Sequence, residues 1–463
     1  MDTIREEKRS HLRVKAKIKV DIAEKIHANS IDVGEGGLSF SSQETISSPA
    51  LSLQVCFPDQ RVSLKAKARL VWRRDTEAGA CLYGVEFVNL KEAQKKTLRA
   101  ELIKTQIGGL LQQIQHPEIR ENVCHFFLKD ILDYISDVTR LTSQLSNKKS
   151  YSQELEKELE HLNNQILLKG YCLELLLADK SIMQRVKNNF RYLVSTWAYK
   201  STIVKRAFEK PRGYPGDYRM LEAVYDNRPV SKKIGCYFDT NFLKSPYAVA
   251  LRLRKDHLRE MLRVYIAQGG TNPIRILNIA CGSCREIREL VPALRTHHPI
   301  VFTCLDLDQE ALNFAHQILS SCISSDIKYK FVKNDVSHIL KDKLALQSLG
   351  KQNFIYSIGL IDYLPDRVLK KLIAALYERL DEGGKLILTH KNKDKTFPPI
   401  SPDWFCNWQF VPRDKYKVIE LIHESKIPHF SLSVESDSFN YIYYFTIIKK
   451  SSRIEKLPSA PKS

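Results

Sequence analysis

The stretch that decides the fold of the C-terminal half is RILNIACGSC, residues 275–284. Its first six residues are an apolar run that predicts a short strand, and residues 285–290 have a helical pattern. A strand, a glycine turn and a helix in this order are typical of a doubly wound nucleotide-binding fold, in which the turn brings backbone N–H groups close to the ligand. Ala280 and Cys284 stand where glycine is usual, so only Gly282 remains of the glycine pattern.

Later strands end in carboxylates at spacings that fit such a fold. Residues 301–305 predict an apolar strand that ends at Asp306, 24 residues after the glycine of the turn, where a carboxylate can hold both ribose hydroxyls. Residues 329–333 predict a strand that leads to Asp335, whose carboxylate can accept from an adenine amine. Further strands are expected at residues 354–359, 386–390 and, as an edge strand, 441–449.

This succession resembles class I S-adenosylmethionine-dependent methyltransferases over about residues 245–450. The resemblance implies a C-terminal α/β Rossmann-like sheet with S-adenosylmethionine as the cofactor. It also implies which residues hold that cofactor: Asn278, Ala280 and Gly282 at its methionine and ribose, Asp306 at the ribose, Asp335 at the adenine, and Gly359 to Asp362 beside the reacting methyl.

Cys281 and Cys284 permit a second interpretation of the turn, a thioredoxin-type redox pair, because such a pair also lies between a strand and a helix. The acidic strand ends that follow do not fit a redox protein. The ten cysteines of the chain are scattered without a framework of spacings, which predicts reduced thiols and no disulfides.

Three segments narrow the resemblance, namely RGYPGDY at residues 212–218, NIACGS at 278–283 and YSIGLIDYL at 356–364. Together they are similar to the bacterial methyltransferases that make 3-hydroxypalmitic acid methyl ester, an extracellular signal. The resemblance implies carboxyl O-methylation of a hydroxy fatty acid or a similar small acid.

A carboxylate acceptor is already ionised at neutral pH, so methyl transfer to it requires positioning in a desolvated site and no general base. The catalytic candidates are Asp362 and Tyr363 after the fourth strand, Tyr214 in the aromatic loop, and His390 after the fifth strand. The structural alternatives are a helix cap for Asp362, a packed ring for Tyr363 and a connector whose tyrosines pack on the domain.

Two further groups of residues are candidates for closing the site. Tyr214, Asp217 and Tyr218 would form a lid over it. Downstream, four residues would form an apolar channel with a cationic end, or belong to the core: Trp404, Trp408, Phe410 and Arg413.

A different site is predicted near the N-terminus, where RSHLR at residues 9–13 is followed by DVGEGG at residues 32–37. Arg9 and Arg13 can fork onto phosphate oxygens or the O6/N7 edge of guanine, and Asp32 can accept from guanine N1 and N2. The glycines allow a tight turn whose backbone N–H groups approach the ligand.

These motifs resemble those of the PilZ family, RxxxR and [D/N]xSxxG, over about residues 5–104. The resemblance implies binding of cyclic di-GMP by Arg9, Arg13, Asp32, Gly34 and Gly37. Gly34 stands where the family has serine, and the lost hydroxyl is worth about 1 kcal/mol. The alternative is a barrel that has lost its ligand and serves as a docking module.

The sequence around the motifs predicts a small antiparallel β-barrel, with strands at residues 14–22, 38–41, 51–57, 62–72 and 81–88. Residues 117–199 have a helical pattern with an apolar stripe of Leu141, Leu145, Leu155, Leu159, Leu162 and Ile166. The stripe is interrupted at Lys148 and Ser152, which favours a helix packed on its own domain over a dimerising coiled coil.

The composition bounds the class of protein. A chain of 463 residues with 43% hydrophobic content is expected to form two or three domains. We expect a PilZ-like barrel over residues 1–108, a helical linker or lid region over 109–244, a methyltransferase domain over 245–450 and a flexible tail over 451–463.

Partners and location also follow from composition. No apolar run is long enough for a transmembrane segment, and the charged start does not fit a signal peptide, so we expect a cytoplasmic protein. A net charge of +19 favours anionic partners such as nucleotides or an acidic carrier protein, while no nucleic-acid-binding motif is present.

The sequence therefore predicts a cyclic di-GMP-responsive methyltransferase acting on a small-molecule or acyl substrate, with no metal. Two alternatives remain at this stage: a nonenzymatic cyclic di-GMP effector with a degenerate methyltransferase-like domain, and a methyltransferase that acts on protein or RNA.

Overall fold

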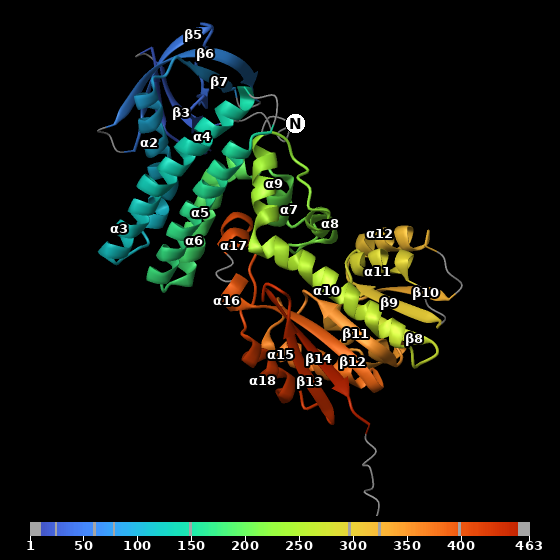
Figure 1. Ribbon diagram of the computed structural model, residues 1–463. Helices are drawn as coiled ribbons and strands as arrows, with labels where there is room; N and C mark the ends of the chain where they lie inside the picture. Colours follow the sequence, from blue (N-terminus) through green and yellow to red (C-terminus); the bar gives the residue numbers. More distant parts are fainter. Residues whose placement is uncertain are drawn as a thin grey trace, which may run out of the picture. The chain divides into compact units, whose positions relative to one another are not determined.

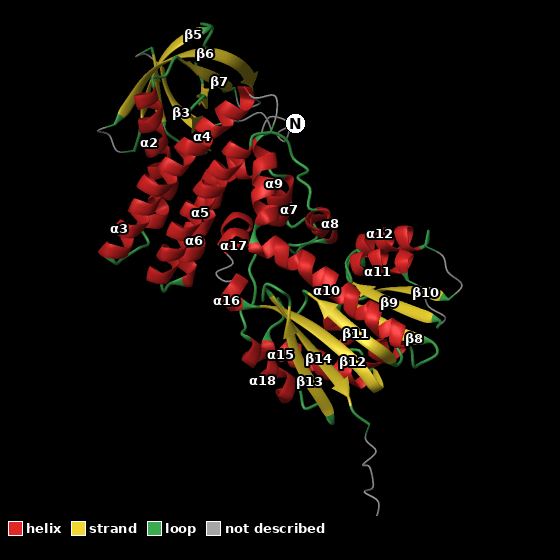
Figure 2. Ribbon diagram, viewed as in Figure 1, coloured by secondary structure: helices red, strands yellow, loops and turns green. Residues whose placement is uncertain are grey.

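The computed structural model describes residues 11–23, 26–58, 62–76, 79–147, 151–294, 298–322, 326–396 and 400–451 (Figures 1 and 2). The chain divides by its internal contacts into two compact units. The first comprises residues 1–205, 229–242 and 404–406, and the second comprises residues 206–228, 243–403 and 407–463. The predicted domain boundaries remain predictions.

The N-terminal part of the first unit is a closed antiparallel barrel, which confirms the predicted architecture (blue in Figure 1). Six strands follow one another in the order β3-β2-β5-β6-β7-β4, and β4 pairs back with β3; β1 lies on the outer edge of β3. Alternate residues face the interior, as Leu51, Leu53 and Val55 do in β5. The strands are β1 (Arg13–Val14), β2 (Lys19–Ile22), β3 (Ile26–Gly34), β4 (Gly37–Ser42), β5 (Ala50–Cys56), β6 (Ser63–Asp75) and β7 (Cys81–Val88).

Helices make up the rest of the first unit, as the sequence predicts (Figure 2). The apolar stripe is split between α4 and α5, and its members are buried in the unit except for the half-buried Leu162. Ser152, which interrupts the stripe, caps α5 by accepting from the N–H of Leu155. The helices are α2 (Glu92–Leu111), α3 (Pro117–His125), the π-helical turn η1 (Phe126–Ile131), α4 (Leu132–Asn147), α5 (Gln153–Leu176), α6 (Lys180–Ala198), the first half of α7 (Thr202–Glu209) and most of α9 (Ile234–Lys244).

The second unit is built on a seven-stranded sheet in the order β10-β9-β8-β11-β12-β14-β13. The strands from β10 to β12 are parallel, whereas β14 runs antiparallel to both β12 and β13. The strand predicted at the edge, β14, is therefore internal, and the unpredicted β13 forms the edge. The strands are β8 (Ile274–Ile279), β9 (Ile300–Asp306), β10 (Ile327–Lys333), β11 (Gln352–Ile358), β12 (Leu380–Lys391), β13 (Phe430–Ser436) and β14 (Ile442–Lys449).

Helices cover both faces of this sheet with separate apolar cores. Leu369 of α15 (Asp366–Glu378) and Leu421 of α18 (Lys415–Glu424) belong to one core. Leu258 of α10 (Pro246–Gln268), Ile287 of α11 (Arg285–Leu290) and Leu312 of α12 (Gln309–Leu319) belong to the other. The remaining elements are α8 (Tyr218–Asp226), η2 (Val291–Ala293), α13 (Val336–Ile339), α14 (Lys343–Ser348), α16 (Lys393–Thr396) and α17 (Ile400–Cys406).

The strand order reverses between β8 and β11. In open α/β sheets ligands bind beyond the carboxyl ends of the strands at this point. The fold therefore directs attention to the loops after β8, β9, β11 and β12. Among the described residues, no helix combines the length and hydropathy needed to cross a membrane.

Candidate functional site

The turn after β8 adopts left-handed backbone at three alternate positions. Ala280, Gly282 and Cys284 have φ values of 56°, 53° and 52°. Alanine and cysteine thus occupy the conformation that glycine would adopt more easily, at a cost of about 1–2 kcal/mol each. The departure from the glycine pattern leaves the shape of the turn intact.

Asp306, at the end of β9, lies directly beside this turn. Its Oδ2 accepts the N–H of Gly282 at 2.7 Å, and its Oδ1 accepts the N–H of Asp308 at 2.9 Å. Burial raises the pKa of Asp306, while these N–H groups counteract the rise. Each carboxylate oxygen keeps a lone pair that can accept from a hydroxyl. The structure therefore brings Gly282 and Asp306 together as predicted.

Asn278 lies beneath the turn in a buried polar group. Its Nδ2 donates to Glu286 at 2.8 Å, and the hydroxyl of Tyr356 donates to the same carboxylate at 2.7 Å. Burial raises the pKa of Glu286 to about 7. The Oδ1 of Asn278 is buried and accepts no hydrogen bond from the described residues, so it can accept from a ligand.

Asp335 lies after β10, next to β9. The N–H of the preceding Asn334 donates to the carbonyl of Asp306 at 3.0 Å. Asp335 is exposed and caps α13 by accepting the N–H of Ser337 at 2.8 Å, and Val336 beside it is buried. The cap uses Oδ1 of Asp335, so Oδ2 of this exposed residue can accept a hydrogen bond from a ligand.

A buried charged cluster lies after β11 and at the end of β12, which runs through His390 and Lys391, so His390 lies within the strand and not after it as predicted. Asp362 is 1% exposed, and its carboxylate accepts from Lys391 Nζ at 2.5 Å and from the Lys391 N–H at 3.1 Å. Arg254 Nη1 lies 3.8 Å from the same carboxylate. Although burial alone would raise the pKa of Asp362, Lys391, His390 and Arg254 bring it well below its usual range.

Several nitrogen atoms of this cluster make few or no hydrogen bonds with the described residues. Burial lowers the pKa of Lys391 to about 8, even though Asp362 acts in the opposite direction. His390 Nδ1 is 2.8 Å from Asp362, yet neither ring nitrogen makes an aligned hydrogen bond with a described residue. Arg254 Nε is likewise buried and without a hydrogen-bond acceptor in the described chain.

Arg254 is held against the loop after β11. Gly359 has a φ of 92°, and a Cβ there would lie 2.7 Å from Arg254 Nη1. Only glycine can therefore take this position beside the guanidinium. Sequence reasoning missed Arg254, because a single arginine in the charged helix α10 resembles an ordinary solvated residue.

Aromatic rings surround the ammonium group of Lys391. Its Nζ lies 4.0 Å from the ring centre of Phe410, 5.1 Å from that of Tyr247 and 6.0 Å from that of Tyr363. Trp408 donates its indole N–H to the Tyr363 hydroxyl at 2.7 Å. Tyr363 is 37% exposed, so the aromatic group has one side open to solvent.

The loop predicted as a lid runs between the two parts of the site. Burial raises the pKa of Tyr214, as do the nearby carboxylates of Asp306 and Asp308. A Cβ at Gly216, whose φ is 73°, would lie 2.5 Å from the Trp408 ring. One loop thus approaches both the Asp306 end and the aromatic end.

Asp217 and Tyr218 support this loop from outside the site. Asp217 caps α8 and accepts from Arg206 at 2.9 Å, and Tyr218 packs on Phe314 of α12 with ring centres 5.4 Å apart. At the start of the loop, Arg212 pairs with Glu310.

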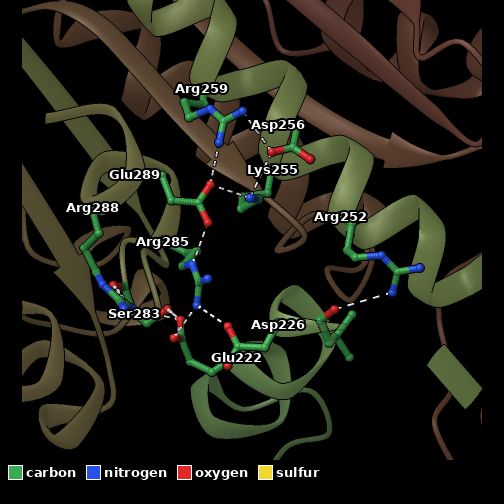
Figure 3. A network of polar contacts seen from close by, with 11 residues as sticks. Glu222, Asp226, Arg252, Lys255, Asp256, Arg259, Ser283, Arg285, Arg288 and Glu289 are labelled. Carbon is green, nitrogen blue, oxygen red and sulfur yellow. Dashed lines mark hydrogen bonds and ion pairs between the residues drawn. The ribbon is translucent and has the colours of Figure 1, made fainter. Parts of the chain in front are cut away.

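A network of ion pairs then fixes α8 to the glycine turn (Figure 3). Glu222 of α8 accepts from the hydroxyl of Ser283 in the turn at 2.6 Å, and from Arg285 and Arg288 of α11 at 2.9 Å each. Arg285 also binds Glu289 at 2.7 Å. The helix that follows the lid loop is therefore clamped to the helix that follows the turn.

The predicted channel residues separate into two groups. Trp408 and Phe410 contact the cluster around Lys391, whereas Trp404 is fully buried in the first unit between Phe126 and Phe190. Arg413 is buried and donates to the backbone carbonyls of Ile361 and Leu364 and to Asp366. Arg413 therefore stabilises the loop that contains Asp362 through its backbone carbonyls.

The thiols of the turn are buried. Cys281 is 8% exposed and Cys284 is fully buried, and Cys304 of β9 lies close to both. Burial raises the pKa of Cys281 well above its usual value. A redox pair requires an accessible thiolate, so this environment does not favour the redox interpretation.

The N-terminal motifs meet on the barrel. Arg13 Nη2 lies 2.6 Å from Asp32 Oδ1, and Asp32 also accepts from the N–H and the hydroxyl of Ser39. Arg9 lies outside the described residues. A cyclic dinucleotide would therefore compete for polar groups that bind each other in its absence.

Backbone packing accounts for two of the three glycines of the second motif, Gly34 and Gly37. A Cβ at Gly34 would lie 2.7 Å from the carbonyl oxygen of Leu12, and one at Gly37 would lie 2.0 Å from that of Val85. A serine at position 34 would need the β1–β3 pair to open, so glycine there is a consequence of close strand pairing.

Two contacts join the motifs to the helices of the same unit. The buried Glu35, between the glycines, accepts from Arg99 Nε of α2 at 2.6 Å, and Arg99 also donates to Ser136 of α4 at 3.0 Å. The N–H of Lys15 donates to the hydroxyl of Tyr192 of α6 at 3.0 Å.

Two protein-family models match the chain, one in its N-terminal part and one in its C-terminal part. Residues 3–104 match the family described as "PilZ domain", and residues 200–394 match the family described as "Putative methyltransferase". No curated protein matches the chain.

Solved structures resemble the chain at low identity. A possible exported protein from Bordetella parapertussis is 15% identical, with 75% of this chain and 97% of that chain covered and a TM-score of 0.39. Magnesium protoporphyrin IX methyltransferase from Synechocystis PCC 6803 is 13% identical, with 44% and 88% covered and a TM-score of 0.34. An S-adenosylmethionine-dependent methyltransferase from Clostridium acetobutylicum ATCC 824 is 12% identical, with 42% and 92% covered and a TM-score of 0.32. The chain thus carries a PilZ domain at its N-terminus and, over residues 200–394, a segment that matches a methyltransferase family.

Proposed function

We propose that this chain is an S-adenosylmethionine-dependent methyltransferase that methylates the carboxylate of a small, partly apolar acid and responds to cyclic di-GMP. The observation that carries the enzyme proposal is the position of Asp306 against the Gly282 N–H, at the same end of the sheet as the buried cluster of Asp362, Lys391 and Arg254.

The polar groups around the turn fit the cofactor. Asp306 would accept from the ribose hydroxyls, the free Oδ1 of Asn278 would accept from the methionine ammonium, and Asp335 with Val336 would hold the adenine. When bound, S-adenosylmethionine supplies an electrophilic methyl group on a sulfonium. The chain's task is then to hold an acceptor oxygen in line with that methyl and away from water.

The charge of the second cluster supports an anionic acceptor. Arg254 and Lys391 are both at least nine-tenths buried and share the carboxylate of Asp362, so one positive charge is left over. A buried charge without a partner is unfavourable, and an acceptor carboxylate would supply the missing anion. Such an acceptor needs no base, since it is ionised at neutral pH.

The rings beside the cations support an apolar body on that acid. Tyr363, Trp408 and Phe410 would cover a hydrocarbon chain, while Asp362 keeps Lys391 oriented towards its head group. A hydroxy fatty acid or a similar small acid combines these two features. Tyr214 would close the site from the lid loop.

The regulatory part of the proposal rests on the connections of the ligand motifs. Arg13, Asp32 and the turn at Gly37 would hold cyclic di-GMP, and Arg9 would join them. Binding would disturb the Arg13–Asp32 pair and thereby the neighbouring Glu35–Arg99 contact with α2. The ligand must bind two states differently to change activity.

A short segment offers a route from the helices to the cluster. Trp404 donates its indole N–H to Glu174 of α5 and lies against Phe190 of α6, in the first unit. Four residues later, Trp408 bonds Tyr363 in the second unit. A shift of α6 would therefore be passed along the chain to the rings around Lys391.

Isothermal titration tests the enzyme proposal. We expect wild-type protein to bind S-adenosylmethionine, and Asp306→Asn to bind it at least tenfold more weakly because hydrogen bonds to a charged acceptor contribute about 1.5–3 kcal/mol. Glu378→Gln, an exposed carboxylate of α15, is the matched control and should bind normally. Absence of binding by the wild type would contradict the enzyme proposal and leave a nonenzymatic effector.

Transfer of tritium from labelled cofactor identifies the acceptor. We expect the label in the lipid or small-acid fraction of a cell lysate. It should be present as a methyl ester, from which mild base releases labelled methanol. Label confined to protein or RNA would contradict the proposed acceptor class while keeping the methyltransferase. Titration with cyclic di-GMP, with Arg13→Ala as the control, tests the regulatory ligand separately.

A further inference from the structure

Helices α2 and α6 of the first unit border a groove of about 570 Å³. It is lined by Gln106, Gly109 and Leu110 from α2 and by Arg185, Asn188, Asn189 and Tyr192 from α6, so polar side chains stand beside apolar surface. Gln106 donates to Asn189 at 2.9 Å across the groove, which fixes the spacing of the two helices. The groove is thus a feature of a packed helix pair.

Gly109 keeps one side of the groove open. Glycine inside a helix destabilises it relative to alanine, so two consecutive glycines at positions 108 and 109 of α2 require a reason. Packing does not supply one, because a Cβ at either position would meet no atom within 4 Å. At Gly109, the lack of a side chain leaves space in the groove.

The side chains of α6 present unused hydrogen-bonding groups to this space. The guanidinium of Arg185 is exposed and forms no ion pair with a described residue. The Asn188 Oδ1 accepts from Arg191 at 2.6 Å and from Gln184 at 3.2 Å. The ring of Tyr192 is 36% exposed. Arginine, asparagine and tyrosine are the residues that read purine edges and stack on purine rings.

The groove adjoins the arginine arm of the barrel. The Tyr192 hydroxyl accepts the N–H of Lys15, two residues after Arg13, and two residues of extended chain span about 7 Å. A ligand held by Arg13 and Asp32 would therefore have part of its surface next to Tyr192.

We propose that this groove binds one guanine base of cyclic di-GMP, with Arg185 on the O6/N7 edge and Tyr192 against the ring. The inference rests on the proposed regulatory ligand and adds that α6 and the end of α2, beyond the PilZ match at residue 104, complete its site. Ligand binding would then hold α2 and α6 together, which links the arm directly to the helix that contacts Trp404.

The test is calorimetric titration of the full chain with cyclic di-GMP and, for base specificity, cyclic di-AMP. Gly109→Leu should fill the groove with a side chain and also raise helix propensity. Gly108→Leu is its control, because it raises helix propensity equally at a position that does not line the groove. Arg185→Ala is paired with Lys180→Ala, which removes a cation from the same helix away from the groove.

We expect Gly109→Leu and Arg185→Ala to weaken cyclic di-GMP binding by about tenfold or more, with Gly108→Leu and Lys180→Ala unchanged. Arg185→Ala should also reduce the preference for cyclic di-GMP over cyclic di-AMP. Thermal unfolding should show all four variants folded, with both glycine variants at least as stable as the wild type, and basal methyl transfer should be unchanged in the controls Gly108→Leu and Lys180→Ala.

The two proposals fail in different ways. If Arg13→Ala abolishes binding while Gly109→Leu and Arg185→Ala bind like the wild type, the groove proposal is overturned and the receptor function stands. If the wild type itself gives no heat at tens of micromolar ligand, both are overturned.

Discussion

Replacing Asp362 with asparagine removes a buried carboxylate while keeping the shape of its side chain. Asp362, Arg254 and Lys391 are 1%, 3% and 7% exposed, and the carboxylate lies 2.5 Å from Lys391 and 3.8 Å from Arg254. Removing one partner of a buried ion pair destabilises a protein by about 3–5 kcal/mol. Lys391 can lose its proton, because its pKa of about 8 would fall further without Asp362.

We therefore expect a loss near the lower end of that range, about 3 kcal/mol. For a unit of this size, each 1 kcal/mol lowers Tm by roughly 2–4 °C, so Asp362→Asn should unfold about 6–12 °C below the wild type. Differential scanning calorimetry measures the shift. Faster hydrogen exchange in peptides from β11 and β12 would assign the loss to the second unit.

The double variant Asp362→Asn/Lys391→Met provides the control. It removes one anion and one cation, so the buried net charge returns to that of the wild type. We expect it to be more stable than Asp362→Asn alone, with a coupling energy above about 1 kcal/mol. A Tm for Asp362→Asn within the error of the wild type, or a double variant that shows the sum of the two single losses, would refute the reasoning.

Three further changes test other parts of the structure. Burial lowers the pKa of Lys391 from 10.5 to about 8, so between pH 8 and 10.5 the unfolded chain holds a proton on this lysine that the folded chain has lost. Raising the pH through this range should therefore stabilise the wild type relative to Lys391→Met. Urea unfolding at several pH values measures the change in this stability difference. Gly34→Ser should lower Tm through the clash with the Leu12 carbonyl and should not strengthen cyclic di-GMP binding; a tighter calorimetric Kd would contradict the packing argument. Cys281→Ser/Cys284→Ser should retain cofactor binding in oxidising and reducing buffer alike, and loss of binding on oxidation of the wild type alone would restore a redox role.

Much of the fold could be predicted because its strands carry a strong pattern. Strands β8, β9 and β11 are largely apolar and buried, while β10 is only partly buried. Carboxylates stand at or after the ends of three of these strands: Asp306 at the end of β9, Asp335 after β10 and Asp362 after β11. The parallel order places these ends at one edge of the sheet, which is why residues far apart in sequence could be assigned to one site.

The sequence does not predict strand β3, because polar Ser30 occupies an interior position and the alternation of apolar and polar residues is lost. Ser30 is buried but satisfied, since it accepts from the N–H of Ile18 and donates to the carbonyl of Ala16. A hydroxyl bonded in this way can take an interior position that the sequence pattern reserves for apolar residues.

The cluster around Asp362 was only partly predictable. Asp362 and Tyr363 follow β11 and His390 lies near the end of β12, so these residues could be named, whereas Arg254 and Tyr247 reach the site from helix α10. Their approach depends on how that helix packs against the sheet, which no local pattern encodes. The same reason separates Trp404 from Trp408, although only three residues lie between them.

The chain passes from one unit to the other after Lys205, Arg228, Phe242, Asp403 and Cys406. No single cut therefore releases either unit whole. A fragment that begins at residue 206 would carry Phe238 and Trp404 without the helices that bury them, and a fragment that ends at residue 205 would lack both rings. Both fragments would be prone to aggregation, so the two units have to be expressed and assayed together as one interlaced polypeptide.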